Sequence, residues 1–365
     1  MKRFVLALTL LVLLLSVPAN AGAWSSGSTL LGVYYGNQGL EMDKVRAMEA
    51  WQQKRHAVLL LYTKWDTSTL TISNLFGKQL PNVWANGNVP IISWDPFTTG
   101  VTPGDIERRV ASGQFDSYIA TWGAKLKTFL SGKDGVYGTS DDRRAYLRVG
   151  HEMNGDWYPW SADGVTTTAA DTIAMWRRVH DKLVPGLGLD GTRLQWLWAV
   201  NASDLGPYTA EQYYPGDAYV DWVGIDGYNW GASQTWSVWQ DPEAVLGPMR
   251  TRLRSLAPTK PLAVSETAST SSTTSGSDLS AKSAWITALF GWLATNDIRL
   301  YCWFNDDKET DWAVFGGSKG DTTYRFRGVT YRGYSALKTS VQSTGIIPTN
   351  TKNPRLLTDA QFQGQ

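Results

Sequence analysis

Residues 148–160 read Arg148-Val149-Gly150-His151-Glu152-Met153-Asn154-Gly155-Asp156-Trp157-Tyr158-Pro159-Trp160, and they continue an apolar run that starts at Ala145. The run has the composition of a strand, whereas the Gly and Pro residues after it are typical of a loop. Glu152 is therefore expected at the carboxyl end of a strand, beside an amide and two indoles. A carboxyl group that is partly shielded from water keeps its proton more readily. Because pyranose rings stack on indoles, the segment is typical of a sugar-cleaving site; a structural turn with buried aromatic residues is the alternative.

Apolar, β-rich runs alternate with segments of helical period along the rest of the chain. Strands are expected at 30–35, 57–62, 89–94, 145–149, 194–200, 219–225, 261–265 and 298–304. Amphipathic helices are expected at 42–53, 72–86, 117–130, 169–183, 243–256 and 281–295. This alternation predicts a single-domain α/β fold, a closed (β/α)8 TIM barrel with its active site at the carboxyl ends of the strands. An open doubly wound sheet is the alternative, but no Gly-x-Gly-x-x-Gly segment follows an early strand.

Functional side chains follow several of the predicted strands. The fourth strand leads into His151 and Glu152, and the seventh leads into Glu266. Neighbouring strands end in aromatic, amide and acidic residues: Trp198, Asn201, Asp226, Tyr228, Asn229, Trp230, Trp303, Asn305 and Asp306. Two carboxyl groups that flank a glycosidic bond can hydrolyse it, with retention at a separation of about 5–5.5 Å and with inversion at a wider one. We therefore expect Glu152 and Glu266 to form a catalytic pair; a structural ion pair between each glutamate and an arginine is the alternative.

The amino terminus has the pattern of a secretory signal peptide. A short basic segment, residues 1–3, precedes an almost unbroken apolar run over residues 4–17. Small residues follow, so cleavage is expected near Ala21 or Ala23, which assigns residues 1–23 to the signal peptide. The apolar run is too short for a membrane span. We expect a secreted, monomeric protein.

Composition excludes several classes of function. A formal net charge of +1 over 365 residues provides no basic face for nucleic acid. The single cysteine, Cys302, and only three histidines disfavour a disulfide and a multi-histidine metal centre, so no cofactor or metal is expected. The oxygen-rich segment 134–142 lacks the twelve-residue calcium-loop pattern, which favours a plain turn there.

The domain boundaries follow from the same patterns. Residues 24–342 are assigned to one barrel domain and residues 343–365 to a polar tail that frays. The Ser/Thr-rich segment 267–280 is expected to be a loop over the barrel mouth. The chain contains 19 tryptophans, and their positions beside Gly, Asn and Asp at strand ends favour an exposed stacking cleft over an aromatic core.

Three segments resemble glycoside hydrolase family 26: residues 151–160, residues 214–230 and Ser265-Glu266-Thr267. The second reads Tyr-Pro-Gly-Asp-Ala-Tyr-Val-Asp-Trp-Val-Gly-Ile-Asp-Gly-Tyr-Asn-Trp. The family consists mostly of endo-β-1,4-mannanases, with some mixed-linkage β-glucanases and β-1,3-xylanases. The resemblance implies a (β/α)8 barrel and retaining hydrolysis of a plant cell-wall polysaccharide by double displacement.

The resemblance also implies roles for individual residues. Glu152 matches the family's acid/base, and Glu266 matches its nucleophile. His151 matches a histidine of the substrate site, and Tyr228 matches the tyrosine that hydrogen-bonds the nucleophile; a core histidine and simple packing are the respective alternatives. Sugar-stacking positions are matched by Trp157 and Trp303. We further expect the substrate cleft to be lined by Trp94, Trp198, Asn201 and Trp230, with packing in the barrel as the alternative for the tryptophans.

Two departures from the mannanase pattern bear on the substrate. Trp157-Tyr158-Pro159-Trp160 stands where many mannanases carry a Phe-Trp-Trp-type sequence, and Ser93-Trp94-Asp95-Pro96 stands where some place a histidine. Both favour a mixed-linkage β-glucan, whereas family frequency keeps β-1,4-mannan ahead; β-1,3-xylan is a further alternative. A carbohydrate-binding protein with an inactive barrel is the non-enzymatic alternative, which the presence of both glutamates disfavours. No Gly-x-Ser-x-Gly elbow supports an esterase.

Overall fold

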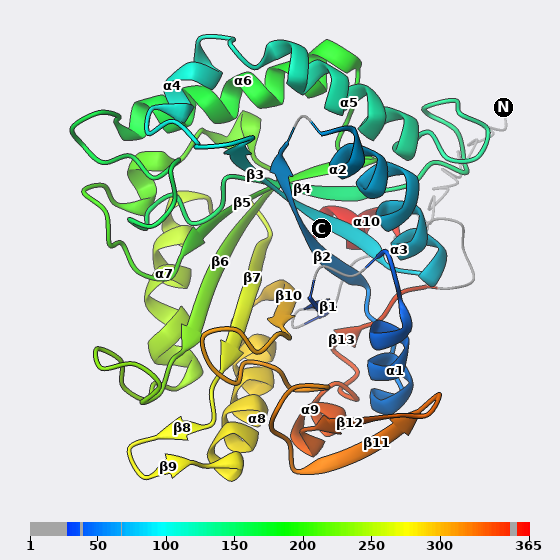
Figure 1. Ribbon diagram of the computed structural model, residues 1–365, viewed down its shortest axis with the longest axis vertical. Coiled ribbons are helices and arrows are strands. Elements are labelled where there is room, and N and C mark those ends of the chain that lie inside the picture. The colour runs from blue at the N-terminus through cyan, green and yellow to red at the C-terminus, as the bar shows by residue number, and fades with distance from the viewer. Residues whose placement is uncertain (1–27, 37–38, 67, 351–355) are drawn as a thin grey trace, which may run out of the picture.

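Eight parallel strands form a closed barrel in the computed structural model, which describes residues 28–36, 39–66, 68–350 and 356–365 (Figure 1). Around the barrel they are β1 (Thr29–Tyr34), β2 (Val58–Trp65), β3 (Val89–Thr98), β4 (Ala145–Val149), β5 (Leu194–Asn201), β6 (Trp222–Asn229), β7 (Leu262–Ser269) and β10 (Ile298–Phe304). Pairing of β10 with β1 closes the ring. The predicted single-domain (β/α)8 barrel is confirmed. The predicted signal peptide lies outside the described residues.

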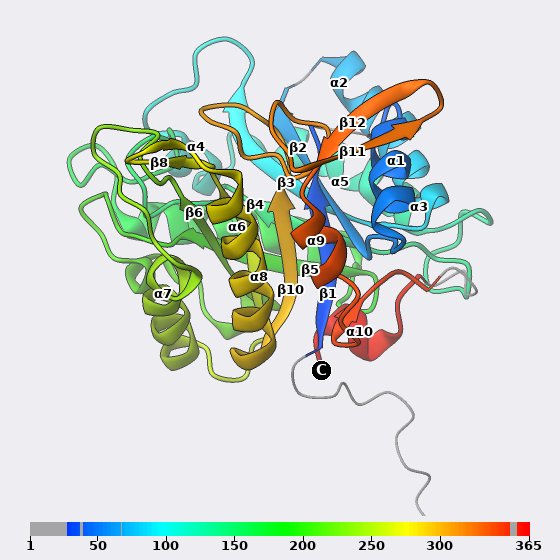
Figure 2. The ribbon, with the colours of Figure 1, turned by 90° about the horizontal axis from the view of Figure 1, so that it is seen from below.

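Helices cover the outside of the barrel (Figures 1 and 2). They are α1 (Asp43–Gln52), α2 (Thr69–Asn74), α3 (Leu80–Asn86), α4 (Ile106–Ala111), α5 (Asp116–Leu130), α6 (Ala169–Leu187), α7 (Pro242–Leu256), α8 (Leu279–Thr295) and α9 (Ser335–Ser340). The predicted helix at 72–86 is divided by the π-helical turn η1 (Leu75–Gln79). The connection from β5 to β6 contains two short 3₁₀ helices, η2 (Ala210–Tyr213) and η3 (Asp217–Tyr219). None of the described helices has the length and apolarity needed to cross a bilayer.

The loops at the barrel mouth contain short elements that the sequence patterns do not predict. The segment expected as a loop at 267–280 begins inside β7 and then forms a small hairpin of β8 (Ser272–Thr273) and β9 (Gly276–Ser277). A second hairpin, β11 (Thr322–Phe326) with β12 (Val329–Gly333), lies beside α1 (Figure 2). The expectation of a plain loop at 267–280 is therefore wrong in part.

Side chains alternate between the barrel interior and the helices along each strand. Leu60, on β2, and Tyr146, on β4, belong to an apolar cluster whose fully buried members include no residue of helices α1 to α9, as expected for the barrel interior. Two residues further along the same strands, the inward positions carry Tyr62 and Arg148. The interior therefore changes from apolar to polar toward the carboxyl ends of the strands.

The prediction of a frayed tail at 343–365 is wrong for its described residues. β13 (Ile346–Ile347) pairs in parallel with the start of β1. α10 (Asp359–Gln363) closes the amino-terminal end of the barrel, where Phe362 is fully buried and its carbonyl accepts a hydrogen bond from the Tyr146 hydroxyl at 3.0 Å. A few apolar residues in a polar segment are enough to cap the barrel.

Candidate active site

Arg148 lies at the centre of the polar layer and is completely buried. Its Nη1 donates to Asp226 Oδ2 at 2.9 Å, its Nη2 donates to Glu266 Oε1, and its Nε donates to Ser93 Oγ at 3.2 Å. A buried guanidinium requires partners of opposite charge because it has lost its hydration. Arg148 therefore holds the carboxyl groups of two neighbouring strands, β6 and β7, in fixed positions.

A β-bulge in β7 directs Glu266 into the barrel. Opposite β6, the partner of Ile225 is Val264, whereas the partner of the next residue, Asp226, is Glu266, so β7 carries one extra residue. Ser265 Oγ donates to Asp226 Oδ1 at 2.6 Å, while the following residue, Glu266, contacts Arg148. Two consecutive inward side chains are incompatible with regular alternation, and bulges commonly re-aim side chains beside active sites.

Two tyrosines fix the Glu266 carboxyl group. The Tyr62 hydroxyl donates to Oε1, and the Tyr228 hydroxyl donates to Oε2 at 2.5 Å. Burial acts to raise the pKa of Glu266, but the charges of Arg148 and His151 and the two hydroxyl donors outweigh it and hold the pKa below its usual value. Glu266 is consequently ionised at neutral pH.

Glu152 occupies a strained turn directly after β4. Its φ is +53°, and Gly150 before it has φ +52°. A non-glycine residue in a sparsely populated backbone region costs about 1–3 kcal/mol, and such strain is concentrated at functional sites. The turn is held by the Glu152 amide, which donates to the Ala199 carbonyl at 3.0 Å. The side-chain carboxyl group of Glu152 is held as well, because Trp157 Nε1 donates to Glu152 Oε2 at 3.1 Å.

The surroundings of Glu152 favour its protonated form. Burial raises the pKa of Glu152 to about 8, and the neighbouring Asp226 and Glu266 carboxyl groups add to the rise, against the opposing charge of His151. Glu152 is thus protonated at pH 7 whereas Glu266 is not. Two carboxyl groups whose surroundings drive their pKa values apart can serve as an acid and a nucleophile in the same site.

His151 is held on both sides of its ring. Nδ1 lies 3.0 Å from Asp95 Oδ1, and Nε2 lies 3.1 Å from the Tyr158 hydroxyl. Burial lowers the pKa of His151, but the Asp95 carboxylate outweighs burial and raises it above its usual value. The ring of Tyr62 lies 5.6 Å from the imidazole, centroid to centroid, so His151 joins the same polar layer.

Three tryptophans predicted to bind substrate are core residues instead: Trp94, Trp198 and Trp303, each at most 1% exposed. On each strand the residue before the tryptophan points into the barrel, so the tryptophan itself points outward to the helices. Trp94 stacks on Trp122 of α5 with ring centroids 3.9 Å apart. Trp303 packs edge-on against Trp285 of α8. The assignment of these three rings to the substrate cleft is therefore wrong.

Substituting Trp303 with alanine is expected to lower the free energy of unfolding by about 3–5 kcal/mol, because a large cavity would open between β10 and α8. Urea denaturation followed by circular dichroism measures this loss. Trp157→Ala is the matched control: Trp157 is 44% exposed, so its removal should leave stability almost unchanged. Equal stability of the two variants would contradict the core assignment.

The other predicted residues lie at the mouth of the barrel. The Trp157 indole donates a hydrogen bond to Glu152, and the Tyr228 hydroxyl donates one to Glu266. Trp230 is half-buried, with its ring centroid 4.8 Å from that of Trp312. Asn201 is half-buried at the end of β5, and its Nδ2 donates to the Ser203 carbonyl at 2.6 Å, within its own loop. The structure thus gathers Glu152, Glu266, His151, Tyr228 and Trp157, with Trp230 and Asn201 on the rim.

Sequence reasoning missed several residues of the site: Arg148, Tyr62, Ser93, Asp95, Tyr158 and Trp312. Arg148 carried a readable signal, because a charged residue inside the apolar run 145–149 must find partners when buried. Tyr62 ends the apolar run of β2 but resembles an ordinary strand residue. Only the closed barrel brings it to Glu266.

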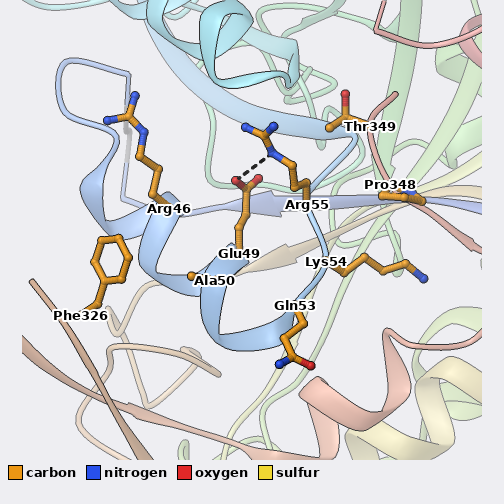
Figure 3. Close-up of a pocket in the computed structure, with 9 residues that line it drawn as sticks. All are labelled: Arg46, Glu49, Ala50, Gln53, Lys54, Arg55, Phe326, Pro348 and Thr349. Atoms are coloured by element: carbon orange, nitrogen blue, oxygen red, sulfur yellow. Dashed lines mark ion pairs between the residues drawn. The ribbon is translucent and has the colours of Figure 1, made fainter. Parts of the chain in front are cut away.

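Two other features do not form part of this site. A cavity of about 610 Å³ opens beside α1, and Arg46, Glu49, Lys54 and Arg55 are among the residues that line it (Figure 3). Glu49 pairs there with Arg55 at 3.7 Å, and no second carboxyl group lines the cavity. In the loop 134–142, Asp141 Oδ2 accepts hydrogen bonds from two backbone amides, as in a plain turn. The described residues include no group of three or more His, Cys, Asp or Glu side chains placed to hold a metal ion.

The chain is similar in sequence to known proteins. Residues 79–258 match the model of Glycosyl hydrolase family 26. Endoglucanase H of Acetivibrio thermocellus is 29% identical over 326 residues, which cover 88% of this chain and 32% of that protein. A mannan endo-1,4-beta-mannosidase of Bacillus subtilis is 26% identical over 169 residues, which cover 44% of this chain and 46% of that protein. The chain thus spans about a third to a half of the length of the curated relatives it matches.

Solved structures share the fold. The catalytic domain of an endo-β-1,4-mannanase from Bacillus sp. JAMB-750 gives a TM-score of 0.60 at 20% identity, covering 88% of each chain. An endo-β-1,4-mannanase variant from Cellulomonas fimi gives a TM-score of 0.60 at 17% identity, covering 91% of this chain and 73% of that one. At these identities the likeness concerns the barrel architecture.

Proposed function

We propose that the chain is a member of glycosyl hydrolase family 26, and that it is a secreted, endo-acting β-glycanase that cleaves a plant cell-wall polysaccharide with retention of configuration. One observation carries the proposal: Glu152 and Glu266 share a buried polar layer, in which burial raises the pKa of Glu152 to about 8 while Arg148 and two tyrosines favour ionised Glu266. This is the protonation pattern that a retaining glycosidase needs before it binds substrate.

In the first step, a Glu266 carboxylate oxygen attacks the anomeric carbon as the bond from that carbon to the leaving oxygen breaks. Glu152 gives its proton to the leaving oxygen, so the aglycone departs as a neutral alcohol. In the second step, the Glu152 carboxylate takes a proton from water, and the resulting oxygen displaces Glu266 from the anomeric carbon. Tyr228 and Arg148 hold Glu266 in place, so that attack requires no reorganisation of the carboxylate.

A β-glucan is the substrate that we place first. The match to Endoglucanase H covers 88% of this chain, whereas the match to the Bacillus subtilis mannan endo-1,4-beta-mannosidase covers 44%. Within β3, Asp95 pairs with His151, at the position where the sequence departs from the mannanase pattern. These observations place β-glucan ahead of β-1,4-mannan, whereas family frequency alone places β-1,4-mannan first. β-1,4-Mannan remains the second candidate because mannosidases are among the matched relatives.

The proposal is tested with barley β-glucan, glucomannan, galactomannan and β-1,3-xylan assayed side by side. We expect new reducing ends to form fastest on barley β-glucan, with the β-anomer released first in time-resolved NMR. If reducing ends formed fastest on galactomannan, β-1,4-mannan would become the first candidate substrate. If the α-anomer were released first, retention would be excluded. Binding to a polysaccharide without any cleavage would instead identify a carbohydrate-binding protein.

A further inference from the structure

The loop after β6 carries an indole that the site described so far does not use. Trp236 is 69% exposed, and Val238, two residues later, is 70% exposed. Residues 231–240 include no Asp, Glu, Lys or Arg, while Ser233, Gln234, Thr235 and Ser237 provide hydroxyl and amide groups. An exposed aromatic ring among neutral polar groups suits an uncharged, hydroxyl-rich ligand better than a charged partner.

A continuous series of aromatic contacts joins Trp236 to the candidate nucleophile. Tyr228, which donates to Glu266, lies 5.2 Å from Trp312, centroid to centroid. Trp312 lies 4.8 Å from Trp230, and Trp230 lies 5.2 Å from Trp236. Each step is comparable with the length of one pyranosyl unit, so Trp236 lies within reach of a sugar chain that extends from the catalytic carboxyl groups.

The loop is anchored at both ends by one buried side chain. Asn229 Oδ1 accepts hydrogen bonds from the amides of Gly231 at 3.2 Å and of Gln240 at 2.9 Å, and Asn229 Nδ2 donates to Ser269 Oγ at 2.9 Å. Inside the loop, Ser237 Oγ donates to the Gly231 carbonyl at 2.8 Å. A platform held in this way loses little conformational entropy when it binds a ligand.

We propose that Trp236 is the stacking platform of a distal subsite, which binds a neutral pyranosyl unit of the polysaccharide two to three units from the bond that is cleaved. The proposal rests on the proposed function, because it assigns to Trp236 the same chain that Glu152 and Glu266 cleave. Trp230 connects the platform to the catalytic centre, and Asn229 is a positioning residue that holds the loop.

The test compares Trp236→Ala with wild type on barley β-glucan and on an aryl β-glycoside of a disaccharide, which is too short to reach the loop. Loss of one stacking contact is expected to reduce kcat/KM on the polymer by about tenfold. The same variant should hydrolyse the aryl glycoside at the wild-type rate and melt at the wild-type temperature. Trp236→Phe should recover most of the lost activity.

Val238→Ala is the matched control, since it removes a similarly exposed apolar side chain from the same loop and should change neither rate. Wild-type activity of Trp236→Ala on the polymer, or equal losses on both substrates, would overturn the distal subsite. Affinity electrophoresis in gels that contain β-glucan tests the platform without turnover, and there Trp236→Ala should lose retardation. Wild-type protein that is retarded but inactive would refute the proposed function while leaving the platform in place.

Discussion

Replacing Glu266 with alanine is expected to lower turnover on polysaccharide by at least about 10⁴-fold, because Glu266 is the side chain proposed to form the covalent bond to the anomeric carbon. The fold should persist, since Arg148 keeps its contacts with Asp226 and Ser93. Release of reducing ends measures the rate, and far-ultraviolet circular dichroism checks the fold. Trapping of wild-type enzyme with a 2-deoxy-2-fluoro glycoside should add the mass of the sugar to the peptide that contains Glu266.

Glu41→Ala serves as the control for loss of a carboxyl group, because Glu41 is exposed in the segment that leads into α1. Its rate should equal that of wild type. A Glu266→Ala variant with wild-type turnover would end the assignment of Glu266 as the nucleophile, and a label on another peptide would reassign it.

The second expected result concerns the leaving group. Glu152→Ala should slow hydrolysis of polysaccharide by about 10²–10⁴-fold, whereas aryl glycosides with acidic phenols, which need no proton, should be affected far less in the first step. Azide should restore part of the rate, since it can attack the glycosyl-enzyme without a general base. Equal losses on both kinds of substrate would contradict an acid/base role.

The pH profile adds an independent measure of the same assignment. Glu152 must be protonated and Glu266 ionised, so kcat/KM on polysaccharide should fall as the pH rises through the Glu152 pKa of about 8. On the acid side it should fall only as the pH drops through the lowered pKa of Glu266. The alkaline limb should be absent when Glu152→Ala acts on an activated aryl glycoside. Its persistence there would assign that limb to another group.

The barrel was predictable because its strands are buried on both faces and therefore appear as short apolar runs. All eight runs correspond to observed strands. The two glutamates could be singled out because each follows such a run. The direction of a side chain on a strand is harder to predict. Trp303 and Trp94 were expected to face the cleft, but both point outward toward the helices. A shift of one residue along the strand is enough to move a side chain from the cleft to the core.

The remaining misses depend on contacts between distant segments. The bulge in β7 that turns Glu266 inward is visible only in its pairing with β6 and β10. Tyr62 and Glu266 are 204 residues apart in the chain, so their hydrogen bond has no local signal. The cap formed by α10 could not be predicted from the sequence, because the segment is mostly polar and only the ring of Phe362 in this helix is buried.

The left-handed backbone of Glu152 sets stability against the proposed activity for anyone who engineers this protein. Asparagine and glycine adopt that conformation more readily than glutamate does. Substitution by either residue would also remove a buried carboxyl group, and with it the cost of keeping that group away from water. Under the proposed acid/base role of Glu152, directed evolution toward heat resistance alone would therefore enrich inactive clones altered at this position, so thermal screening has to be coupled to a selection for catalysis.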